Sequence, residues 1–502
     1  MNSTDLARSV VAALVESGVG EVVLAPGSRN APLSFAVYDA AAAGLLRLHT
    51  RLDERSAGFL ALGLTRVGAR AAVVCTSGTA VANLHPALLE AAHAGLPVVA
   101  VTADRPARLR GTGANQTTDQ VGIFGPLLPT LDLSASASFG RGSPTVTALA
   151  DTTRPSHLNV QLDDPLVPPP DGAGWELTPR LRTPATGEER QAAGPDPHHL
   201  APNGIPRGPR TVVVAGDDAG PPARVLAERG NWPLLAEPTS GSRTGANALR
   251  CYRLLLDGPL GQRIERAVVL GHPTLSRPVT RLLGREDVEV WSRPPLGVWA
   301  ERPFPVDVSF DRIEVDEPDE PAWFEEWRTA DREAAARLDR LLAEEEGITP
   351  HEVAGAVARG VPPGGLLYVG ASSPIRDLDL MVPRYAVGDR RKILANRGLS
   401  GIDGTVSSAV GAVLGRPRTT RALALMGDVT FLHDANGLVL GPDEPVPDLT
   451  IVVVNDDGGS IFAMLEQGAA EYADRYDRLF GTPHGVDLAS LCAATRTPHW
   501  RV

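Results

Sequence analysis

The 502-residue sequence predicts an α/β protein made of three doubly wound domains, each built around a parallel sheet. Two observations lead to this fold class. Short, apolar, β-branched segments alternate with longer amphipathic stretches, the pattern of buried parallel strands joined by crossover helices. The chain is also too long for one core, because a domain usually takes about 150 residues. We therefore expect domains at 1–166, 211–346 and 347–502, with a linker at 167–210.

The first domain begins with an amphipathic helix near the N-terminus, for which Ser3 or Thr4 is the expected cap. Three strand-like runs follow, each apolar on both faces, and helical stretches separate them. The strands are expected at 21–25, 71–76 and 98–102, and helices at 54–67 and 79–93.

The segment 167–210 is rich in Pro and Gly and lacks an apolar period, which is typical of a linker. The second domain then has strand-like runs at 211–216, 266–271 and 288–292, and a charged helix at 330–346 leads to the third. That domain opens on Thr349-Pro350-His351-Glu352, a capping box with Pro at the first helical position. Its strands are expected at 365–370, 421–427 and 449–455.

The composition of the chain argues against several classes of protein. The formal charge of −12 argues against a protein that binds nucleic acid, for which a basic excess is usual. Three widely spaced cysteines predict neither a disulfide framework nor a zinc site, and they favour a reducing compartment. The N-terminal segment lacks the pattern of a signal peptide, and no apolar run has the length of a membrane span. We therefore expect a cytoplasmic protein that is not bound to membranes.

Polar residues follow two neighbouring strands of the third domain. One strand ends in Gly427-Asp428-Val429, and the next ends in Asn455-Asp456-Asp457-Gly458-Gly459. Carboxyl ends of parallel strands meet at one edge of a sheet, where such folds bind ligands. The carboxylate and amide oxygens suit Mg²⁺, and the glycines let the backbone approach a diphosphate closely.

This arrangement resembles the thiamine diphosphate-binding motif, whose usual form is GDG followed by NN. The resemblance implies thiamine diphosphate and Mg²⁺ or Mn²⁺ as cofactors. It makes Asp428 a metal ligand, with Asp456, or Asn455 if the register shifts by one, as the second side chain. It further implies that Gly458 supplies a carbonyl, that Gly427 and Ser77 contact the cofactor, and that Glu54 lies against the pyrimidine ring.

Five further motifs stand at loops beside strand ends: APGSRN at 25–30, TADRP at 102–106, GTGANQ at 111–116, GASSPIR at 370–376 and ANRGLSGIDG at 395–404. Together they resemble the 2-succinyl-5-enolpyruvyl-6-hydroxy-3-cyclohexene-1-carboxylate synthases, transferases of menaquinone biosynthesis, over most of the chain. The resemblance implies decarboxylation of 2-oxoglutarate and conjugate addition of the remaining fragment to isochorismate.

Both substrates are dicarboxylates, and guanidinium groups bind carboxylates through two parallel hydrogen bonds. Arg29, Arg105, Arg376 and Arg397 all lie in these motifs, and we expect them to form an anion site that takes part in catalysis. By resemblance, the pocket is also lined by Ser28, Asn115, Gln116, Arg277 and Ser372, with Ile402 under the cofactor and Ile461 and Phe462 as an apolar wall.

The resemblance implies a homodimer or homotetramer, because the Glu54 domain of one subunit faces the diphosphate domain of another. The sequence departs from the family in two places. Compared with the family, a bridging helix of about 25 residues is expected to be absent between Gly125 and His157, and a final strand and helix of about 50 residues after the helix-like stretch near Val502. Two alternatives therefore stay open: another thiamine diphosphate decarboxylase or carboligase, and a catalytically impaired binding relative.

Overall fold

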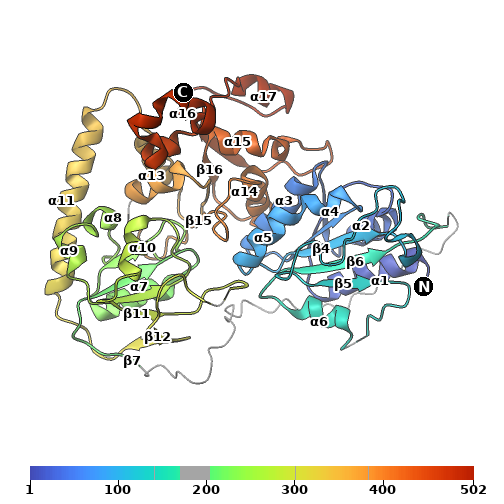
Figure 1. The fold of residues 1–502 in the computed structure, drawn as a ribbon, viewed down its shortest axis with the longest axis horizontal. Coiled ribbons are helices and arrows are strands. Elements are labelled where there is room, and N and C mark those ends of the chain that lie inside the picture. The colour runs from blue at the N-terminus through green and yellow to red at the C-terminus, as the bar shows by residue number, and fades with distance from the viewer. Residues whose placement is uncertain (141, 170–203, 300, 383) are drawn as a thin grey trace.

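The computed structural model of the protein describes residues 1–140, 142–169, 204–299, 301–382 and 384–502. Three units are visible in Figure 1: an N-terminal unit in blue and teal, a central unit in green and yellow, and a C-terminal unit in orange and red. Every strand pair in their sheets is parallel, which confirms the predicted α/β fold class. Of the predicted linker, 170–203 lies outside the described residues.

The N-terminal unit has a six-stranded sheet in the order β2-β1-β3-β4-β6-β5. Helices pack apolar side chains onto both of its faces, as buried parallel strands require. Its strands are β1 (Glu21–Leu24), β2 (Arg47–Thr50), β3 (Ala71–Cys75), β4 (Val99–Asp104), β5 (Thr130–Leu133) and β6 (Ser156–Gln161). Its helices are α1 (Ser3–Glu16), α2 (Ala31–Ala42), α3 (Glu54–Arg66), α4 (Thr79–Asn83), α5 (His85–His93) and α6 (Pro144–Ala150).

Two local predictions for this unit are wrong. The cap of α1 is Asn2, whose side chain accepts a hydrogen bond from the Asp5 amide at 2.8 Å. Ser3 instead donates its hydroxyl to the Asp163 carbonyl and so ties the helix to the chain after β6. The single helix predicted at 79–93 is two helices, α4 and α5, because Pro86 in the first turn of α5 starts a new helix.

The central unit has a five-stranded sheet in the order β12-β11-β10-β8-β9, beside a two-stranded pair of β13 and β7. Gly204–Ile205 therefore belongs to this unit and not to the linker, because Ile205 is buried in its core. The strands are β7 (Gly204–Ile205), β8 (Thr211–Ala215), β9 (Leu234–Ala236), β10 (Arg266–Leu270), β11 (Glu289–Ser292), β12 (Val308–Ser309) and β13 (Glu314–Val315). The helices are α7 (Pro221–Gly230), α8 (Tyr252–Leu255), α9 (Pro259–Gln262), α10 (Arg277–Leu283) and α11 (Ala322–Glu344).

Helix α11, predicted at 330–346, begins earlier because Trp323, Phe324 and Trp327 pack into the central core. The C-terminal unit follows with a four-stranded sheet in the order β15-β14-β16-β17, and the predicted capping box at Thr349 is present. Its strands are β14 (Leu366–Val369), β15 (Lys392–Leu394), β16 (Ala422–Gly427) and β17 (Leu449–Val454). Its helices are α12 (Pro350–Gly360), α13 (Ser373–Met381), α14 (Thr405–Leu414), α15 (Asp428–His433), α16 (Ala473–Tyr476) and α17 (Leu488–Ala494).

The three units meet around helix α3. Its small residue Gly63 packs so closely on α14 that a Cβ there would collide with the Ser408 carbonyl. From the end of α3, the buried Arg66 reaches the central Asp217 carboxylate at 3.2 Å and the Ala395 carbonyl of the C-terminal unit. Contacts of α3 thus join the N-terminal unit to both other units of the same chain. In the part of the chain that the structure describes, no helix is long and apolar enough to cross a membrane.

Candidate active site

The residues singled out from the sequence gather mainly at the carboxyl ends of parallel strands, as expected for this fold class. They form three separate groups. The first is Glu54 with the arginine loops of the N-terminal unit, the second surrounds Asp428, and the third joins Arg376 and Arg397 to the central unit.

Glu54 is the first residue of α3. Asp53 caps this helix by accepting hydrogen bonds from the amides of Arg55 and Ser56, which fixes where the helix starts. The Glu54 side chain is half-buried and has no hydrogen-bond or ion-pair partner among the described residues. Its carboxylate is therefore available to a ligand, although it lies at a rigid helix terminus.

The C-terminal unit holds the chain on both sides of Glu54. Before it, the Glu444 carboxylate accepts hydrogen bonds from Thr50 at 2.6 and 2.7 Å and from Arg51 at 2.8 Å. After it, Arg55 donates to the His433 carbonyl at 2.6 Å and Ser56 donates to the Asp434 carboxylate at 3.1 Å.

The buried Asp434 also accepts the Ser407 amide at 2.7 Å. Burial raises the pKa of Asp434, and its hydrogen bonds oppose that shift. One segment of the C-terminal unit, 433–444, thus fixes the position of Glu54.

A second feature of the N-terminal unit is a pair of arginines over Ser77. Arg105, which follows β4, donates to the Ser77 hydroxyl, and Gln116 donates to the Ser77 carbonyl at 2.8 Å. Arg29, which follows β1, lies close enough to repel the Arg105 guanidinium. Burial, and then this repulsion, lower the pKa of Arg105. The Nε of Arg29 is buried without a partner in the described chain. The predicted residues Ser28, next to Arg29, and Asn115, next to Gln116, are exposed.

At the diphosphate edge, Asp428 starts helix α15 and is buried. Its Oδ2 accepts the Gly458 amide at 3.0 Å and lies 3.0 Å from Nε2 of His484. The Asn455 side chain is engaged in its own loop, where it accepts the Asp457 amide at 3.1 Å. Asp456 is exposed.

The residues at this edge fit a hard cation held together with a phosphate ligand. Two carboxylates and a backbone carbonyl supply oxygen donors and leave positions for phosphate oxygens and water. Gly458 has a φ of 152°, and a Cβ there would collide with the Gly481 carbonyl, so only glycine fits. Within the described ranges, no three His, Cys, Asp or Glu side chains form a metal cluster of their own.

The third group contains Arg376 and Arg397. Ser372 adopts a φ of 76° at the start of α13, a strained conformation typical of functional sites, and its carbonyl accepts Arg376 at 2.6 Å. Burial, followed by repulsion from Arg397 and Arg253, lowers the pKa of Arg376.

Arg397 is held by all three units. Glu90 of α5 accepts the amides of Gly398 and Leu399, both at 2.7 Å, and the Arg397 guanidinium donates to the Thr274 hydroxyl at 2.5 Å. A cavity of about 440 Å³ between the three units reaches this arginine.

Four other predicted residues stand apart from these groups. Arg277 is exposed and pairs with Glu466 at 2.7 Å, and its side chain therefore lies on the surface. Ile461 and Phe462 lie in a short 3-10 turn after Gly459, where Phe462 contacts the Phe480 ring. Ile402 is half-buried in the loop before α14.

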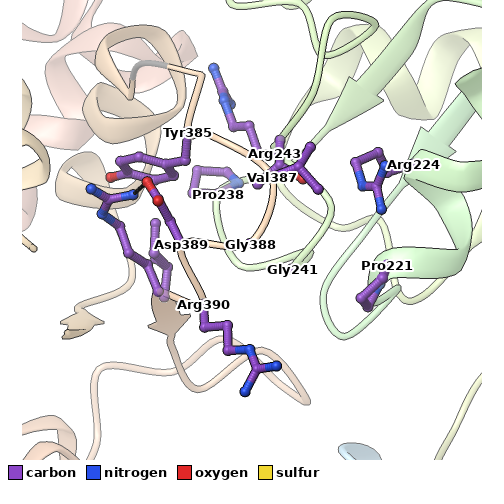
Figure 2. Close-up of a pocket in the computed structure, with 13 residues that line it drawn as sticks. Pro221, Arg224, Pro238, Gly241, Arg243, Tyr385, Val387, Gly388, Asp389 and Arg390 are labelled. Carbon is purple, nitrogen blue, oxygen red and sulfur yellow. Dashed lines mark hydrogen bonds and ion pairs between the residues drawn. The ribbon is translucent and has the colours of Figure 1, made fainter. Parts of the chain in front are cut away.

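A smaller pocket of about 240 Å³ lies between the central and C-terminal units (Figure 2). Figure 2 shows arginines around it, including Arg224 and Arg390, and the Arg391 guanidinium stacks on the Tyr385 ring at 4.4 Å. This pocket faces the amino end of β15, whereas Arg397 follows the carboxyl end of the same strand. It is therefore not part of the strand-end site.

Sequence reasoning missed the residues that support these groups. His484 stands in a Gly-Thr-Pro-His turn far from Asp428 along the chain, and nothing in that turn points to the contact. Glu90, Asp434 and Glu444 are single acidic residues in helices and loops. Their burial could have been predicted only from the packing of one unit on another.

Similarity to known proteins identifies the family of this chain. Residues 4–123 match the family described as "Thiamine pyrophosphate enzyme, N-terminal TPP binding domain". The chain is 69% identical to a protein of a Nocardioides species over 100% of this chain and 91% of the relative. It is 46% identical to one from Kineococcus radiotolerans, over 99% and 91%, and 46% identical to one from an Arthrobacter species, over 100% and 86%.

All three relatives carry the same name, and a 69% identity over the whole chain is far above what a shared fold alone would require. The chain therefore belongs to the 2-succinyl-5-enolpyruvyl-6-hydroxy-3-cyclohexene-1-carboxylate synthase family of thiamine diphosphate-dependent transferases.

Proposed function

We propose that this chain decarboxylates 2-oxoglutarate and joins the remaining fragment to isochorismate, releasing CO₂ and the product that gives the family its name. The observation that carries the proposal is the presence of two arginine pairs, Arg29 with Arg105 and Arg376 with Arg397, at strand ends. Like charges held together repel one another, so each pair is best explained as a site for an anion. Two dicarboxylate substrates supply such anions, whereas a small monocarboxylate such as pyruvate does not need both pairs.

Thiamine diphosphate, when bound, supplies the electron sink for loss of CO₂ from a 2-oxo acid. Glu54 would hydrogen-bond a ring nitrogen of the cofactor and exchange a proton with it. Asp428, Asp456 and the Gly458 carbonyl would hold Mg²⁺ or Mn²⁺ against the diphosphate. The loop bond made by Asn455 supports Asp456 as the second side-chain ligand.

We also propose a homo-oligomer whose active sites lie between subunits. No hydrogen bond or ion pair joins Glu54 to Asp428 across the described residues of one chain. Large apolar side chains beside the site motifs are exposed: Leu52, two residues before Glu54, is 77% exposed, and Leu399, two residues after Arg397, is 49% exposed. A second copy covering this surface would bury them and complete the site. Sedimentation at several protein concentrations would detect the dimer, and a monomer that is fully active would contradict it.

The proposed reaction is tested by measuring CO₂ release from 2-oxoglutarate with added thiamine diphosphate and Mg²⁺, with and without isochorismate. Release that rises with isochorismate, together with a product of the summed mass less CO₂, supports the proposal. Turnover of pyruvate in preference to 2-oxoglutarate would overturn it in favour of another decarboxylase. If the folded protein binds the cofactor but releases no CO₂, the alternative of a catalytically impaired binding relative would be favoured.

Arg105→Met is expected to raise the KM of a dicarboxylate substrate at least about 10-fold, because one hydrogen bond to a charged group is lost. The matched control is Arg108→Met, since Arg108 lies three positions later and pairs on the surface with Asp163. Steady-state kinetics with each substrate varied would show which carboxylate Arg105 binds. An equal effect of both substitutions would remove Arg105 from the pocket.

His484→Ala is expected to tighten Mn²⁺ binding about 10-fold in the presence of thiamine diphosphate. The reason is that His484 contacts the carboxylate that would hold the metal, and that contact would compete with metal binding. Titration of Mn²⁺ followed by electron paramagnetic resonance measures the affinity, with His499→Ala as an exposed control. Weaker binding would instead place His484 among the groups that support the metal.

A further inference from the structure

Glu237, at the end of β9 in the central unit, has a buried carboxyl oxygen with no protein partner. The side chain is 2% exposed. Its Oε1 accepts the backbone amides of Thr274 and Leu275 at 3.0 and 2.9 Å. Its Oε2 is fully buried and makes no hydrogen bond to any described residue. Since a buried polar atom without a partner costs free energy, this oxygen calls for a functional explanation.

Two arginines lie within electrostatic reach of Glu237. Arg397 is 3% exposed, bonds the hydroxyl of the same Thr274 whose amide Glu237 holds, and has a buried Nε without a partner in the described chain. The charges of Arg397 and Glu237 both act on Arg376. Arg376, Arg397 and Glu237 thus lie within electrostatic reach of one another where the central unit meets the C-terminal unit.

The charged and titratable groups around Glu237 explain its protonation state. Burial raises the pKa of Glu237 to about 8, against the attraction of Arg397 and the bonds to the amides. Most of the other neighbours are already paired: Asp379 with Arg243 and Tyr252, and Asp217 with Arg66. At neutral pH, Glu237 is mostly the uncharged acid. Because Oε1 accepts two amides, Oε2 carries the proton and is a donor without an acceptor.

We propose that Glu237 is a substrate-binding residue whose carboxyl group donates a hydrogen bond to a carboxylate of the substrate, beside Arg397 and Arg376. This inference rests on the proposed function, because it takes these two arginines as the site of a dicarboxylate. A neutral acid among arginines adds a third donor without neutralising their charge. An ionised glutamate in the same place would compete with the substrate for the guanidinium groups.

The alternative is that Glu237 only stabilises the loop 274–275 by accepting its two amide hydrogen bonds. Two substitutions distinguish this structural role from substrate binding. Glu237→Gln keeps an oxygen for the two amides and an N–H donor at the second position. Glu237→Leu removes both, and its folding is checked by thermal unfolding and by thiamine diphosphate affinity. Glutarate, a dicarboxylate without a keto group, serves as the probe, and its inhibition constant against 2-oxoglutarate is measured from pH 6.5 to 9.

For the unmodified protein, glutarate affinity is expected to fall as the pH rises through about 8, where Glu237 loses its proton. Glu237→Gln is expected to bind glutarate as tightly at pH 9 as at pH 7. Glu237→Leu is expected to weaken binding about 10- to 100-fold at pH 7 with thiamine diphosphate affinity unchanged. Two results would overturn the inference. In the first, the glutarate affinity of the Gln variant shows the full pH dependence of the unmodified protein. In the second, the Leu variant has normal glutarate affinity.

The same experiment separates this inference from the proposed function. If the unmodified protein does not decarboxylate 2-oxoglutarate at all, the proposed reaction fails. If it does so and the Glu237 variants respond like the unmodified protein, only the role of Glu237 fails.

Discussion

Glu54→Gln is expected to lower the kcat of CO₂ release by about 100-fold or more while leaving thiamine diphosphate affinity within a small factor. A positioned acid–base group contributes roughly 10²- to 10⁴-fold, and an amide cannot exchange the proton that a carboxylate can. Cofactor binding should survive because the amide fills the same space at the start of α3 and Asp53 still caps the helix. The measurement is kcat at saturating cofactor, with the cofactor dissociation constant determined by calorimetry.

The control for Glu54 is Glu16→Gln, an exposed residue at the end of α1 in the same unit. Full activity of the Glu54 variant would show that another group activates the cofactor. Loss of cofactor binding together with activity would show that Glu54 holds the ring in place and would leave its acid–base role without support.

Asp428→Asn is expected to weaken Mn²⁺ binding, and with it thiamine diphosphate binding, by at least about 100-fold. Supporting residues around a metal alone account for about 10- to 100-fold in affinity, and a charged ligand contributes more. Asparagine keeps one oxygen that can accept the Gly458 amide, so the fold around α15 should persist. Electron paramagnetic resonance of Mn²⁺ and the cofactor dissociation constant are the two readouts.

The matched control is Asp474→Asn, because Asp474 is an exposed aspartate of the same unit that forms an ion pair with its neighbour Arg475. Normal Mn²⁺ affinity in the Asp428 variant would remove this residue from the metal site. A variant that loses metal affinity together with its cooperative thermal unfolding would indicate a structural role and would count against the assignment.

The sequence predicted the fold class because the feature that defines it is local. Parallel strands buried on both faces must be short, apolar runs between helices, and β3, β8 and β16 all lie within the predicted segments. The strand-end motifs were predictable for the same reason, because they adjoin the strands in sequence. Asp428 follows β16 directly, and Arg29 and Arg105 follow β1 and β4. One error occurred where the deciding contact is distant, because Trp323 and Trp327 extend α11 by packing into the central core. The two errors in the N-terminal unit have local causes, the neighbouring cap Asn2 and the helix start at Pro86.

The sequence alone thus determined the three parallel-sheet units, the strand-end arginines, and the family to which the motifs belong. Only the tertiary structure decided that 433–444 holds Glu54, that His484 contacts Asp428, that Arg277 pairs with Glu466 on the surface, and that the charge of Arg397 acts on the buried Glu237. In each of these cases the partners lie far apart along the chain or in different units. Their contacts follow from how packed units bury polar groups, and local sequence carries no information about which buried groups will meet.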